Sequence, residues 1–462
     1  MKEHYLIHQY KLNGYNIVID GNSGSIHSVD KPAYMAIHLL DEGISEKEIY
    51  TELTKKFQLE EYEINELLND INDMKKEGIL FSEDPYEDVA SKFKNNQSVL
   101  KAICLHVAHG CNMDCEYCFA GKGEYSGKAG IMPLHVGKAA LDFLVRESGE
   151  RKNLEVDFFG GEPLLNWDVC KELVAYGREL EKKYNKKFNF TLTTNGILID
   201  DDVIEFTSKE MCNVVLSLDG RKSVHERMRH AKVSNGEYEK IIDNFSKLVE
   251  AREKLHKEYY VRGTYTAYNK DFATDVIKMA DLGFKETSIE PVVIATDADY
   301  KLRDDDIDYL CNQYEKLSLE MLKRRKQGKP FNFYHYNIDL NGGPCIYKRV
   351  SGCGTGTEYL AVTPTGDLYP CHQFVSDDDF KLGDVFTGIT NIKKQNIFRE
   401  GNNLYTRNAC KNCFAKFYCS GGCSANNYHY NGNIDKVHEF SCKLHRKRIE
   451  CAIMMKVAEQ EN

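Results

Sequence analysis

The sequence predicts an α/β protein whose centre is an open, partial TIM-like barrel of six β/α units. Apolar strand-like runs alternate with amphipathic helical patterns from residue 101 to about 300, and a cysteine-rich region follows. The strand candidates are Ala102–His106, Leu154–Phe159, Phe188–Thr193, Asn213–Leu218, Tyr259–Thr266 and Thr287–Val293. The helix candidates lie near Leu134–Glu147, Val169–Tyr184, Asp201–Ser208, Tyr238–Leu255 and Asp275–Leu282.

Distinctive residues follow the first four strand candidates, where a barrel of parallel strands binds its ligands. They are Cys111–Cys118 after the first strand, Gly160-Gly161-Glu162-Pro163 after the second, Thr193-Thr194-Asn195-Gly196 after the third, and Ser217-Leu218-Asp219-Gly220 after the fourth. A random scatter of such residues would not place them all at one edge of the sheet. The carboxyl ends of these strands are therefore the predicted site.

A small unit, residues 1–83, precedes the barrel. Strand-like runs at Tyr15–Asp20 and Ser25–Val29 come first, and three helical patterns follow. Ser45 and Glu48 form a capping box at the start of the second helix. The third helix has apolar residues at helical spacing and a glycine at the position of a left-handed cap: Ile64, Leu67, Leu68, Ile71, Met74 and Gly78. Residues 84–100 are predicted to be a linker, because the stretch 82–97 is polar and acidic.

The C-terminal third has a different residue pattern from the barrel region. Residues 301–340 are predicted to be a connecting helical segment, and helical periodicity fades in residues 341–462. Cysteines dominate there, at Cys345, Cys353, Cys371, Cys410, Cys413, Cys419, Cys423 and Cys442. This region is expected to be a separate domain held together by bound metal.

Composition restricts the partners and the compartment. The net charge of −10 and pI near 5.9 argue against a nucleic-acid backbone or an anionic membrane as partner. The start of the chain has no apolar signal region, and no stretch approaches the ~18 apolar residues of a membrane helix. The expected location is cytoplasmic. Sixteen cysteines in that reducing compartment point to metal or redox ligation rather than disulfides.

Cys111, Cys115 and Cys118 have the spacing CxxxCxxC, which suits an iron–sulfur cluster with an open iron. Three thiolates cannot fill a 4Fe-4S cubane that needs four ligands. The amino and carboxylate groups of S-adenosylmethionine (SAM) suit the vacant position. The alternative is a zinc site, but zinc motifs usually pair cysteines as CxxC or with histidines, and only His109 is near enough in sequence to complete a tetrahedron.

Residues 101 to about 300 resemble a radical SAM enzyme, through CxxxCxxC with an aromatic residue before its last cysteine and through GGEP after the second strand. The resemblance implies reductive cleavage of SAM to methionine and a 5′-deoxyadenosyl radical. It also implies that Tyr117 lies near the adenine and that the backbone of Gly160, Gly161 and Glu162 meets the SAM amino group. Three further SAM contacts are expected: Ser217 and Arg229 to the carboxylate, and Asn195 to the ribose or methionyl part.

The C-terminal cysteine pattern resembles a SPASM domain, which binds two auxiliary 4Fe-4S clusters. By that resemblance the first cluster takes Cys353, Cys371 and Cys423, and the second takes Cys410, Cys413, Cys419 and Cys442. Cys345 is either the fourth ligand of the first cluster or not a ligand, which would leave an open iron. With the first motif, the expected cofactors are three 4Fe-4S clusters and SAM. Eight cysteines could instead make two zinc sites.

The N-terminal unit resembles the winged-helix peptide-recognition element of enzymes that modify ribosomally made peptides; the alternative is a plain helical cap on the barrel. If the resemblance holds, a leader peptide adds as a strand beside Ser25–Val29. Sulfatase maturases carry an aspartate base directly after the cysteine that corresponds to Cys371, whereas this chain has His372 and Gln373. The combination therefore resembles maturases of the SCIFF type, which link cysteine sulfur to threonine in short cysteine-rich peptides.

The expected partners are a precursor peptide with a leader segment and an external electron donor such as flavodoxin or ferredoxin. Among enzymes, the alternative is formation of formylglycine, as by an anaerobic sulfatase maturase. Two alternatives from other classes are an iron–sulfur electron-transfer protein, which would not need the GGEP, TTNG and SLDG loops, and a zinc-dependent peptide-binding module, which would purify colourless.

Overall fold

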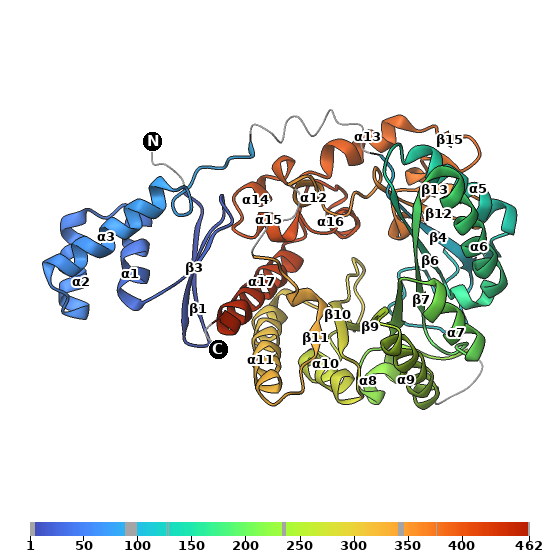
Figure 1. The fold of residues 1–462 in the computed structure, drawn as a ribbon, viewed down its shortest axis with the longest axis horizontal. Helices are drawn as coiled ribbons and strands as arrows, with labels where there is room; N and C mark the ends of the chain where they lie inside the picture. The colour runs from blue at the N-terminus through green and yellow to red at the C-terminus, as the bar shows by residue number, and fades with distance from the viewer. Residues whose placement is uncertain are drawn as a thin grey trace.

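The computed structural model describes residues 5–87, 99–125, 127, 129–232, 237–340, 346–375 and 377–460, without the side chains of 346–348. A three-stranded N-terminal sheet with its helices stands at one end, and a curved twelve-stranded sheet with its helices fills the rest (Figure 1). Cys345 lies outside the described residues.

The curved sheet contains the six predicted strands, all parallel and adjacent in chain order. They are β4 (Ala102–His109), β6 (Asn153–Gly160), β7 (Lys187–Thr194), β8 (Asn213–Ser217), β9 (Glu258–Tyr265) and β10 (Glu286–Pro291). The predicted helices are present as α5 (Leu134–Glu147), α6 (Trp167–Tyr184), α7 (Asp201–Glu210), α9 (Tyr238–Lys254) and α10 (Phe272–Asp281). A short helix not predicted, α8 (Lys222–Met228), follows β8. The α/β prediction and its parallel sheet are confirmed.

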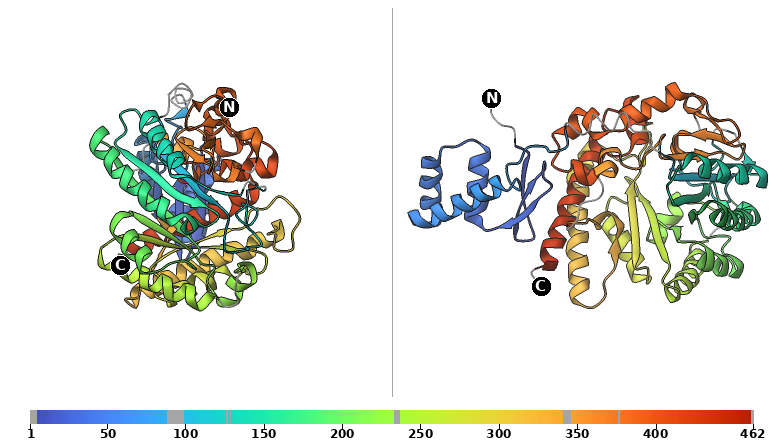
Figure 2. Two further views of the ribbon diagram at one scale, coloured as in Figure 1. Left: turned by 90° about the vertical axis from the view of Figure 1, so that its right-hand side faces the viewer. Right: turned by 45° about the horizontal axis from the view of Figure 1, so that its top comes forward.

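The two faces of the curved sheet differ in chemistry because side chains alternate along each strand. On β6, Leu154, Val156 and Phe158 are fully buried in the core shared with the outer helices. Asp157 and Phe159 occupy the alternate positions of the strand and therefore point to the concave face. The same alternation on β7 to β10 leaves polar residues facing the inside of the open barrel. Figure 2 shows the ribbon of the barrel from two further directions.

The sheet continues beyond the six predicted strands. At one end β11 (Asn332–Phe333), which follows helix α11 (Ile307–Lys326), pairs parallel with β10. At the other end β12 (Tyr359–Val362) pairs parallel with β4 and leads into β13 (Asp367–Tyr369), β14 (Gly383–Asp384) and β15 (Gly388–Ile389), all antiparallel. The cysteine-rich region is thus joined to the barrel through main-chain hydrogen bonds along β4. The sequence did not predict these strands of two to four residues.

The N-terminal unit is an antiparallel sheet followed by three helices. Strand β1 (Ile7–Leu12), which the sequence did not predict, pairs with β2 (Tyr15–Asp20), and β2 pairs with β3 (Ile26–Val29). The helices are α1 (Lys31–Asp41), α2 (Glu46–Phe57) and α3 (Glu61–Lys76). The Ser45–Glu48 capping box and the left-handed Gly78 after α3 are both present. The sheet packs on both faces, because Val18 lies in the core under these helices whereas Ile17 and Ile19 lie in a core shared with the C-terminal helix.

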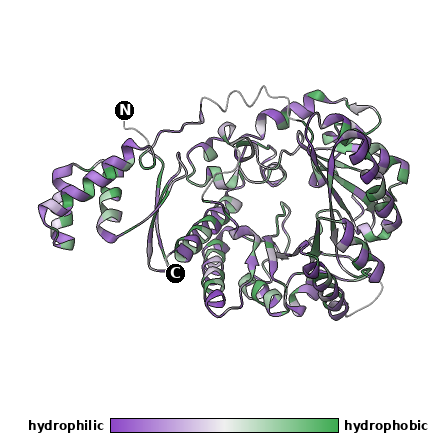
Figure 3. Cartoon of the chain, in the orientation of Figure 1, coloured by the Kyte–Doolittle hydropathy of each residue, from purple (hydrophilic) through white to green (hydrophobic). Residues whose placement is uncertain are grey.

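The C-terminal region contains more helix than its sequence suggested. Helices α12 (Ile346–Ser351), α13 (Ile392–Gly401), α14 (Asn408–Lys411), α15 (Lys416–Cys419) and α16 (Ser424–Asn431) are short. Helix α17 (Glu439–Gln460) runs 22 residues and packs along α11 between the N-terminal sheet and the barrel (Figure 1). In Figure 3 the helices show mixed polar and apolar colouring along their length. No helix within the described ranges combines the length and apolar character that a membrane span requires.

Candidate functional site

The loop after β4 brings the first three cysteines together. Burial raises the pKa of Cys111 to about 11 and that of Cys115 to about 12, and the neighbouring thiol of Cys118 adds to both shifts. The loop is fixed by main-chain hydrogen bonds to the segment after α8, from the Asp114 N–H to the His230 oxygen (2.6 Å) and from the Glu116 N–H to the Met228 oxygen (2.9 Å). Thiols with raised pKa values release protons when they bind a metal. Such binding is therefore favoured at higher pH.

The two glycines of GGEP are required by the close approach of β4. A Cβ atom on Gly160, where φ is +124°, would lie 2.2 Å from the Ala108 oxygen. A Cβ atom on Gly161 would lie 1.9 Å from the Gly110 oxygen. The Gly161 N–H donates to the Ala108 oxygen at 2.8 Å. These contacts press the GGEP backbone against the residues that lead into Cys111.

Glu162 connects the GGEP loop to the TTNG loop. Its carboxyl group accepts hydrogen bonds from Thr194 Oγ1 (2.8 Å), the Asn195 N–H (2.8 Å) and the Leu164 N–H (3.1 Å). Burial raises its pKa to about 7, although these three donors oppose the shift. The residue whose backbone was predicted to meet SAM thus holds two loops together through its side chain, and its backbone N–H donates to the Gly110 oxygen at 2.9 Å.

Asn195 lies beside the cysteine loop. Its Nδ2 donates to Asn112 Oδ1 at 2.7 Å and lies 3.7 Å from Cys111 Sγ. The side chain therefore joins the third strand end to the first. Its contact with SAM stays a prediction.

Tyr117 and Arg229 share a buried carboxylate that the sequence did not assign. Tyr117 donates from its hydroxyl to Asp219 Oδ2 at 2.5 Å, and Arg229 Nε donates to the same oxygen at 3.0 Å. Asp219 is fully buried, and its other oxygen accepts from the Thr264 N–H at 2.9 Å. The carboxylate partner of Arg229 in this structure is therefore Asp219. The signal was available, since Asp219 belongs to the SLDG loop.

Ser217 ends β8 on the concave face and is paired in register with Arg262 of β9. Arg262 lies near a cluster of charged residues centred on Glu290 of β10. The Glu290 carboxyl group contacts His335 at 3.3 Å and Arg448 of α17 at 3.2 Å. Burial opposes ionisation of Glu290, but these two neighbours hold its pKa well below its usual range. Sequence reasoning missed this group, because its members come from three distant parts of the chain.

Cys353, Cys371 and Cys423 come together as predicted for the first auxiliary cluster. Burial raises the pKa of Cys371, and the nearby thiols of Cys423 and Cys353 raise it further. Cys353 likewise acts on Cys423. Cys371 lies two residues after the end of β13, the strand that pairs with β12, so this group lies next to the barrel.

Cys410, Cys413, Cys419 and Cys442 form a second group. Burial raises the pKa of Cys410 to about 11 and that of Cys442 to about 12; Cys419 adds to both shifts. Cys413 in turn raises the pKa of Cys419. The structure thus separates the two sets that the sequence assigned to different clusters.

Arg407 lies between the two groups of cysteines. It is 1% exposed, and it donates to the Gly421 oxygen at 2.8 Å and to the Ile434 oxygen at 3.1 Å. Burial lowers its pKa, whereas the thiols of Cys410, Cys419 and Cys423 favour its charged form. A fixed cation here stabilises thiolates in both groups.

Three rings fill the space between the first cysteine motif and the first auxiliary group. Phe119, which follows Cys118, lies 5.3 Å from His372, which follows Cys371. The centroid of the Phe159 ring lies 5.1 Å from that of His372 and 6.4 Å from that of Phe119, so the three rings contact one another. His109, the residue considered for zinc, is engaged with His106 (3.1 Å) and stacked on Tyr125.

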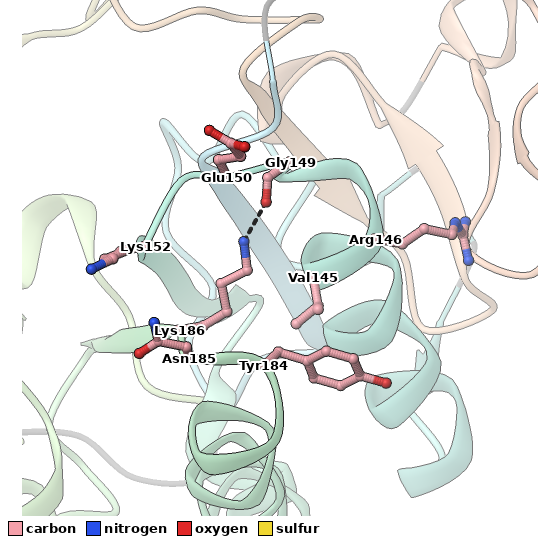
Figure 4. Close-up of a pocket in the computed structure, with 8 residues that line it drawn as sticks. All are labelled: Val145, Arg146, Gly149, Glu150, Lys152, Tyr184, Asn185 and Lys186. Carbon is pink, nitrogen blue, oxygen red and sulfur yellow. Dashed lines mark hydrogen bonds between the residues drawn. The ribbon is translucent and has the colours of Figure 1, made fainter.

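A surface pocket lies at the opposite end of the barrel (Figure 4). Its residues come from the end of α5, the segment before β6, and the turn between α6 and β7: Val145, Arg146, Gly149, Glu150, Lys152, Tyr184, Asn185 and Lys186. Lys186 Nζ donates to the Gly149 oxygen at 2.5 Å and to the Arg151 oxygen at 2.8 Å. None of the predicted site residues lines this pocket.

Comparison with known proteins agrees with this geometry. Residues 105–256 match the radical SAM superfamily, and residues 353–414 match the SPASM iron–sulfur cluster-binding domain. The radical SAM cyclopropyl synthase TigE of Paramaledivibacter caminithermalis is 22% identical over 443 residues, which cover 92% of this chain and 89% of that protein. A cysteine-type anaerobic sulfatase-maturating enzyme of Clostridium perfringens is 28% identical over 354 residues, which cover 70% of this chain and 88% of that enzyme.

Solved structures show the same fold. Native anSMEcpe with bound AdoMet and the Cp18Cys peptide has a TM-score of 0.62 and 22% identity, covering 79% of this chain and 99% of that one. SuiB of Streptococcus suis bound to its precursor peptide SuiA has a TM-score of 0.51 and 16% identity, covering 94% and 98%. This chain therefore carries a radical SAM domain followed by a SPASM domain, which together indicate 4Fe-4S clusters and SAM as its cofactors.

Proposed function

We propose that this protein is a radical SAM peptide maturase that forms intramolecular thioether crosslinks from cysteine sulfur to an acceptor residue, threonine in the first instance, in a short ribosomally made cysteine-rich peptide. The observation that carries the proposal is the N-terminal unit, a three-stranded sheet with three helices that is attached to the cysteine-rich end of a radical SAM barrel. The match to TigE covers 92% of the chain and so includes most of this unit.

The cysteine groups suit three iron–sulfur clusters. The cluster that binds SAM would be held by Cys111, Cys115 and Cys118. The first auxiliary cluster would be held by Cys353, Cys371 and Cys423. The second auxiliary cluster would be held by Cys410, Cys413, Cys419 and Cys442. Within the described residues, no three Cys, His, Asp or Glu side chains converge as they do round one metal ion. The matches to the radical SAM superfamily and to the SPASM iron–sulfur cluster-binding domain favour clusters over the zinc alternative.

The bound cofactors supply the radical chemistry: reduced cluster and SAM give a 5′-deoxyadenosyl radical that abstracts hydrogen, and an auxiliary cluster accepts the electron left after the carbon–sulfur bond forms. The chain positions the groups around this event. Glu162 and Asn195 join the loops at the SAM side, and Asp219 holds Tyr117 and Arg229 in place. The rings of Phe119, Phe159 and His372 contact one another on the way to the first auxiliary group.

The leader of the precursor is proposed to bind at β3. The sheet order is β1-β2-β3, so β3 is an edge strand. The opposite edge, β1, is engaged with α17, where the Tyr10 hydroxyl donates to the Glu450 oxygen at 2.9 Å. An extended leader that adds beside β3 would gain main-chain hydrogen bonds there. We include in this proposal that the N-terminal unit serves as the winged-helix peptide-recognition element that its sequence resembles.

Formation of formylglycine is the second candidate. The 28% identity to a cysteine-type sulfatase-maturating enzyme favours it. His372 argues against it, because the ring packs against both Phe119 and Phe159 and its Nδ1 lies 3.5 Å from the Tyr359 hydroxyl. An imidazole in these surroundings has a pKa lowered to about 4 by burial. It does not reproduce the aspartate that the sulfatase maturases carry at this place.

The test uses anaerobically reduced, cluster-loaded protein with SAM and a short cysteine-rich peptide encoded beside its gene. We expect 5′-deoxyadenosine and loss of two hydrogens per bridge in equal amounts. Each bridge must also remove one thiol from alkylation by iodoacetamide. Loss of hydrogens with all thiols still reactive would point to a carbon–carbon bond instead, as in cyclopropane formation.

A sulfatase-type peptide with a cysteine substrate residue tests the second candidate in parallel. Conversion of its cysteine to an aldehyde, detected with a hydrazide probe, would overturn the thioether proposal in favour of formylglycine. No 5′-deoxyadenosine from an iron-loaded sample with either peptide or with SAM alone would favour the electron-transfer alternative.

A further inference from the structure

The segment Cys410–Cys419 has two roles in the structure. It carries three of the four cysteines of the second auxiliary group, and the residues between them hold the N-terminal unit. The contacts come from Phe414, Lys416 and Tyr418, which all lie between Cys413 and Cys419. We call Cys410–Cys419 the ligand segment.

Lys416 is the centre of this contact. Its side chain is 1% exposed, and its Nζ donates to Asp84 Oδ2 at 2.7 Å and to Asn22 Oδ1 at 2.9 Å. Both acceptors belong to the N-terminal unit and the residues directly after it. Asp84 also accepts from the Tyr405 hydroxyl at 3.0 Å, on the C-terminal side. A buried ammonium group is stable only while these acceptors stay in place.

Phe414 and Tyr418 extend the contact. The ring of Phe414 is stacked on that of His8 in β1, with centroids 3.6 Å apart and planes 1° from parallel. The Tyr418 hydroxyl donates to the Gly24 oxygen at 2.9 Å. A Cβ atom on Gly21 would lie 2.8 Å from the Phe414 Cα, so the two backbones touch at the end of β2.

The fourth cysteine of the group is tied to the same strand. Cys442 lies on α17, and Glu450 of that helix accepts from His8 Nε2 at 2.9 Å. His8 therefore contacts the ligand segment with its ring face and α17 with its ring nitrogen. All elements that carry this cysteine group thus meet at the N-terminal sheet.

We propose that loading of the second auxiliary cluster and seating of the N-terminal unit on the C-terminal domain are coupled. The inference rests on the proposed cluster ligands, and through them on the proposed function. Iron bound by the cysteines fixes the backbone of the ligand segment, and only a fixed segment presents Phe414, Lys416 and Tyr418 together. By linkage, an N-terminal unit in place favours iron binding to the same degree.

The N-terminal unit has a core of its own, so it can leave its seat without unfolding. Ile37, Ile49, Leu53, Ile64 and Ile71 are buried in the core under α1, α2 and α3, away from the ligand segment. Release of the unit should therefore expose β1 and residues 79–87 while α2 and α3 stay protected. The coupling gives the enzyme a means to present a leader peptide only when the second cluster is intact.

Hydrogen–deuterium exchange of the full chain under anaerobic conditions tests the forward direction. The variant Cys413→Ser/Cys419→Ser removes ligands of the second group, and Cys353→Ser/Cys423→Ser is the matched control in the first group. We expect amides of β1 and of 79–87 to exchange roughly tenfold faster or more in the first variant only, with α2 and α3 unchanged. Iron content is measured on the same samples.

The reverse direction uses release of iron to a chelator. The variant His8→Ala/Tyr418→Phe removes two contacts between the N-terminal unit and the ligand segment without changing a cysteine. The control variant His38→Ala/Tyr62→Phe changes two exposed residues of the N-terminal unit. We expect the first variant to lose the iron of one cluster several-fold faster than the control, with the remaining iron released at the unchanged rate.

The outcomes separate the possible failures. Full iron content in Cys413→Ser/Cys419→Ser would show that these cysteines bind no cluster, which would overturn both the ligand assignment and the coupling. Loss of iron with unchanged exchange in β1 would overturn the coupling alone. Peptide crosslinking by the wild-type protein reports on the proposed function independently of either result.

Discussion

The buried carboxyl group of Glu162 accepts a hydrogen bond from the backbone N–H of Asn195 at 2.8 Å, and this contact fixes the GGEP loop to the TTNG loop across two neighbouring strands. The same carboxyl accepts from Thr194 Oγ1 at 2.8 Å. The two loops therefore form one rigid edge of the proposed SAM site. Rigidity of this edge depends on one side chain.

Glu162→Ala should weaken SAM binding about tenfold or more, because it removes the acceptor of three buried donors, each at a cost of about 1–3 kcal/mol. Equilibrium dialysis of SAM against anaerobically loaded protein measures the effect. Asp168→Asn, an exposed carboxyl at the start of α6 with a side chain 92% exposed, is the control. Unchanged SAM affinity in Glu162→Ala would show that the loops are held by other contacts.

Asp219→Asn should destabilise the cysteine loop far more than Tyr117→Phe. The first change leaves Arg229, with a side chain 11% exposed, without its carboxylate, which typically costs about 3–5 kcal/mol. The second removes only a hydroxyl group and should cost about 1 kcal/mol. Urea unfolding under anaerobic conditions, followed by iron content, compares the two. Equal losses would contradict the shared-carboxylate arrangement.

The parts of the fold with strong local periodicity could be predicted from the sequence. The six barrel strands and five helices are five to eighteen residues long, and their apolar residues recur with the period of a strand or a helix, so their predicted bounds agree with the structure to within a few residues. The short strands β12–β15 contain two to four residues, too few to show an alternation. Helix α17 was missed because its buried residues lie on more than one face, against both α11 and the N-terminal sheet.

The site divides in the same way. Motifs that are local in sequence predicted which cysteines gather, and the structure brings the first three and the two auxiliary sets together. Contacts between distant residues could not be predicted. Lys416 and Asp84 are 332 positions apart, and residues 84–87 were expected to form part of a linker although Asp84 is a buried partner. Residues 88–98 of that linker lie outside the described residues.

His372→Ala should uncouple radical formation from product. The ring contacts both Phe119 and Phe159 between the SAM side and the first auxiliary group, and its loss opens space there to water. We expect several-fold more 5′-deoxyadenosine per crosslink, with SAM affinity unchanged. His38→Ala, at an exposed position of α1, should behave as wild type. A constant ratio of 5′-deoxyadenosine to crosslink would show that the ring has no part in containing the radical.

The raised pKa of Asp157 predicts how the free energy of unfolding depends on pH. Burial, with a smaller contribution from Glu155, raises its pKa to about 7 on the concave face of β6. The folded protein therefore binds this proton more tightly than the unfolded chain, whose aspartate titrates near pH ~4. The contribution of this bound proton to the free energy of unfolding is fully present below pH ~4 and is lost as pH rises towards 7. The free energy of unfolding should therefore fall by about 1 kcal/mol between pH 6 and pH 8.

Asp157→Asn keeps the shape of the side chain and removes this titration. The difference in unfolding free energy between variant and wild type should therefore grow by about 1 kcal/mol in favour of the variant from pH 6 to pH 8. Glu162, whose pKa burial also raises to about 7, is present in both proteins and cancels in the comparison. Denaturant unfolding at four pH values in this range gives the measurement. A difference that stays constant with pH would show that Asp157 is already ionised in the folded protein at pH 6, and that polar groups on the concave face compensate its burial.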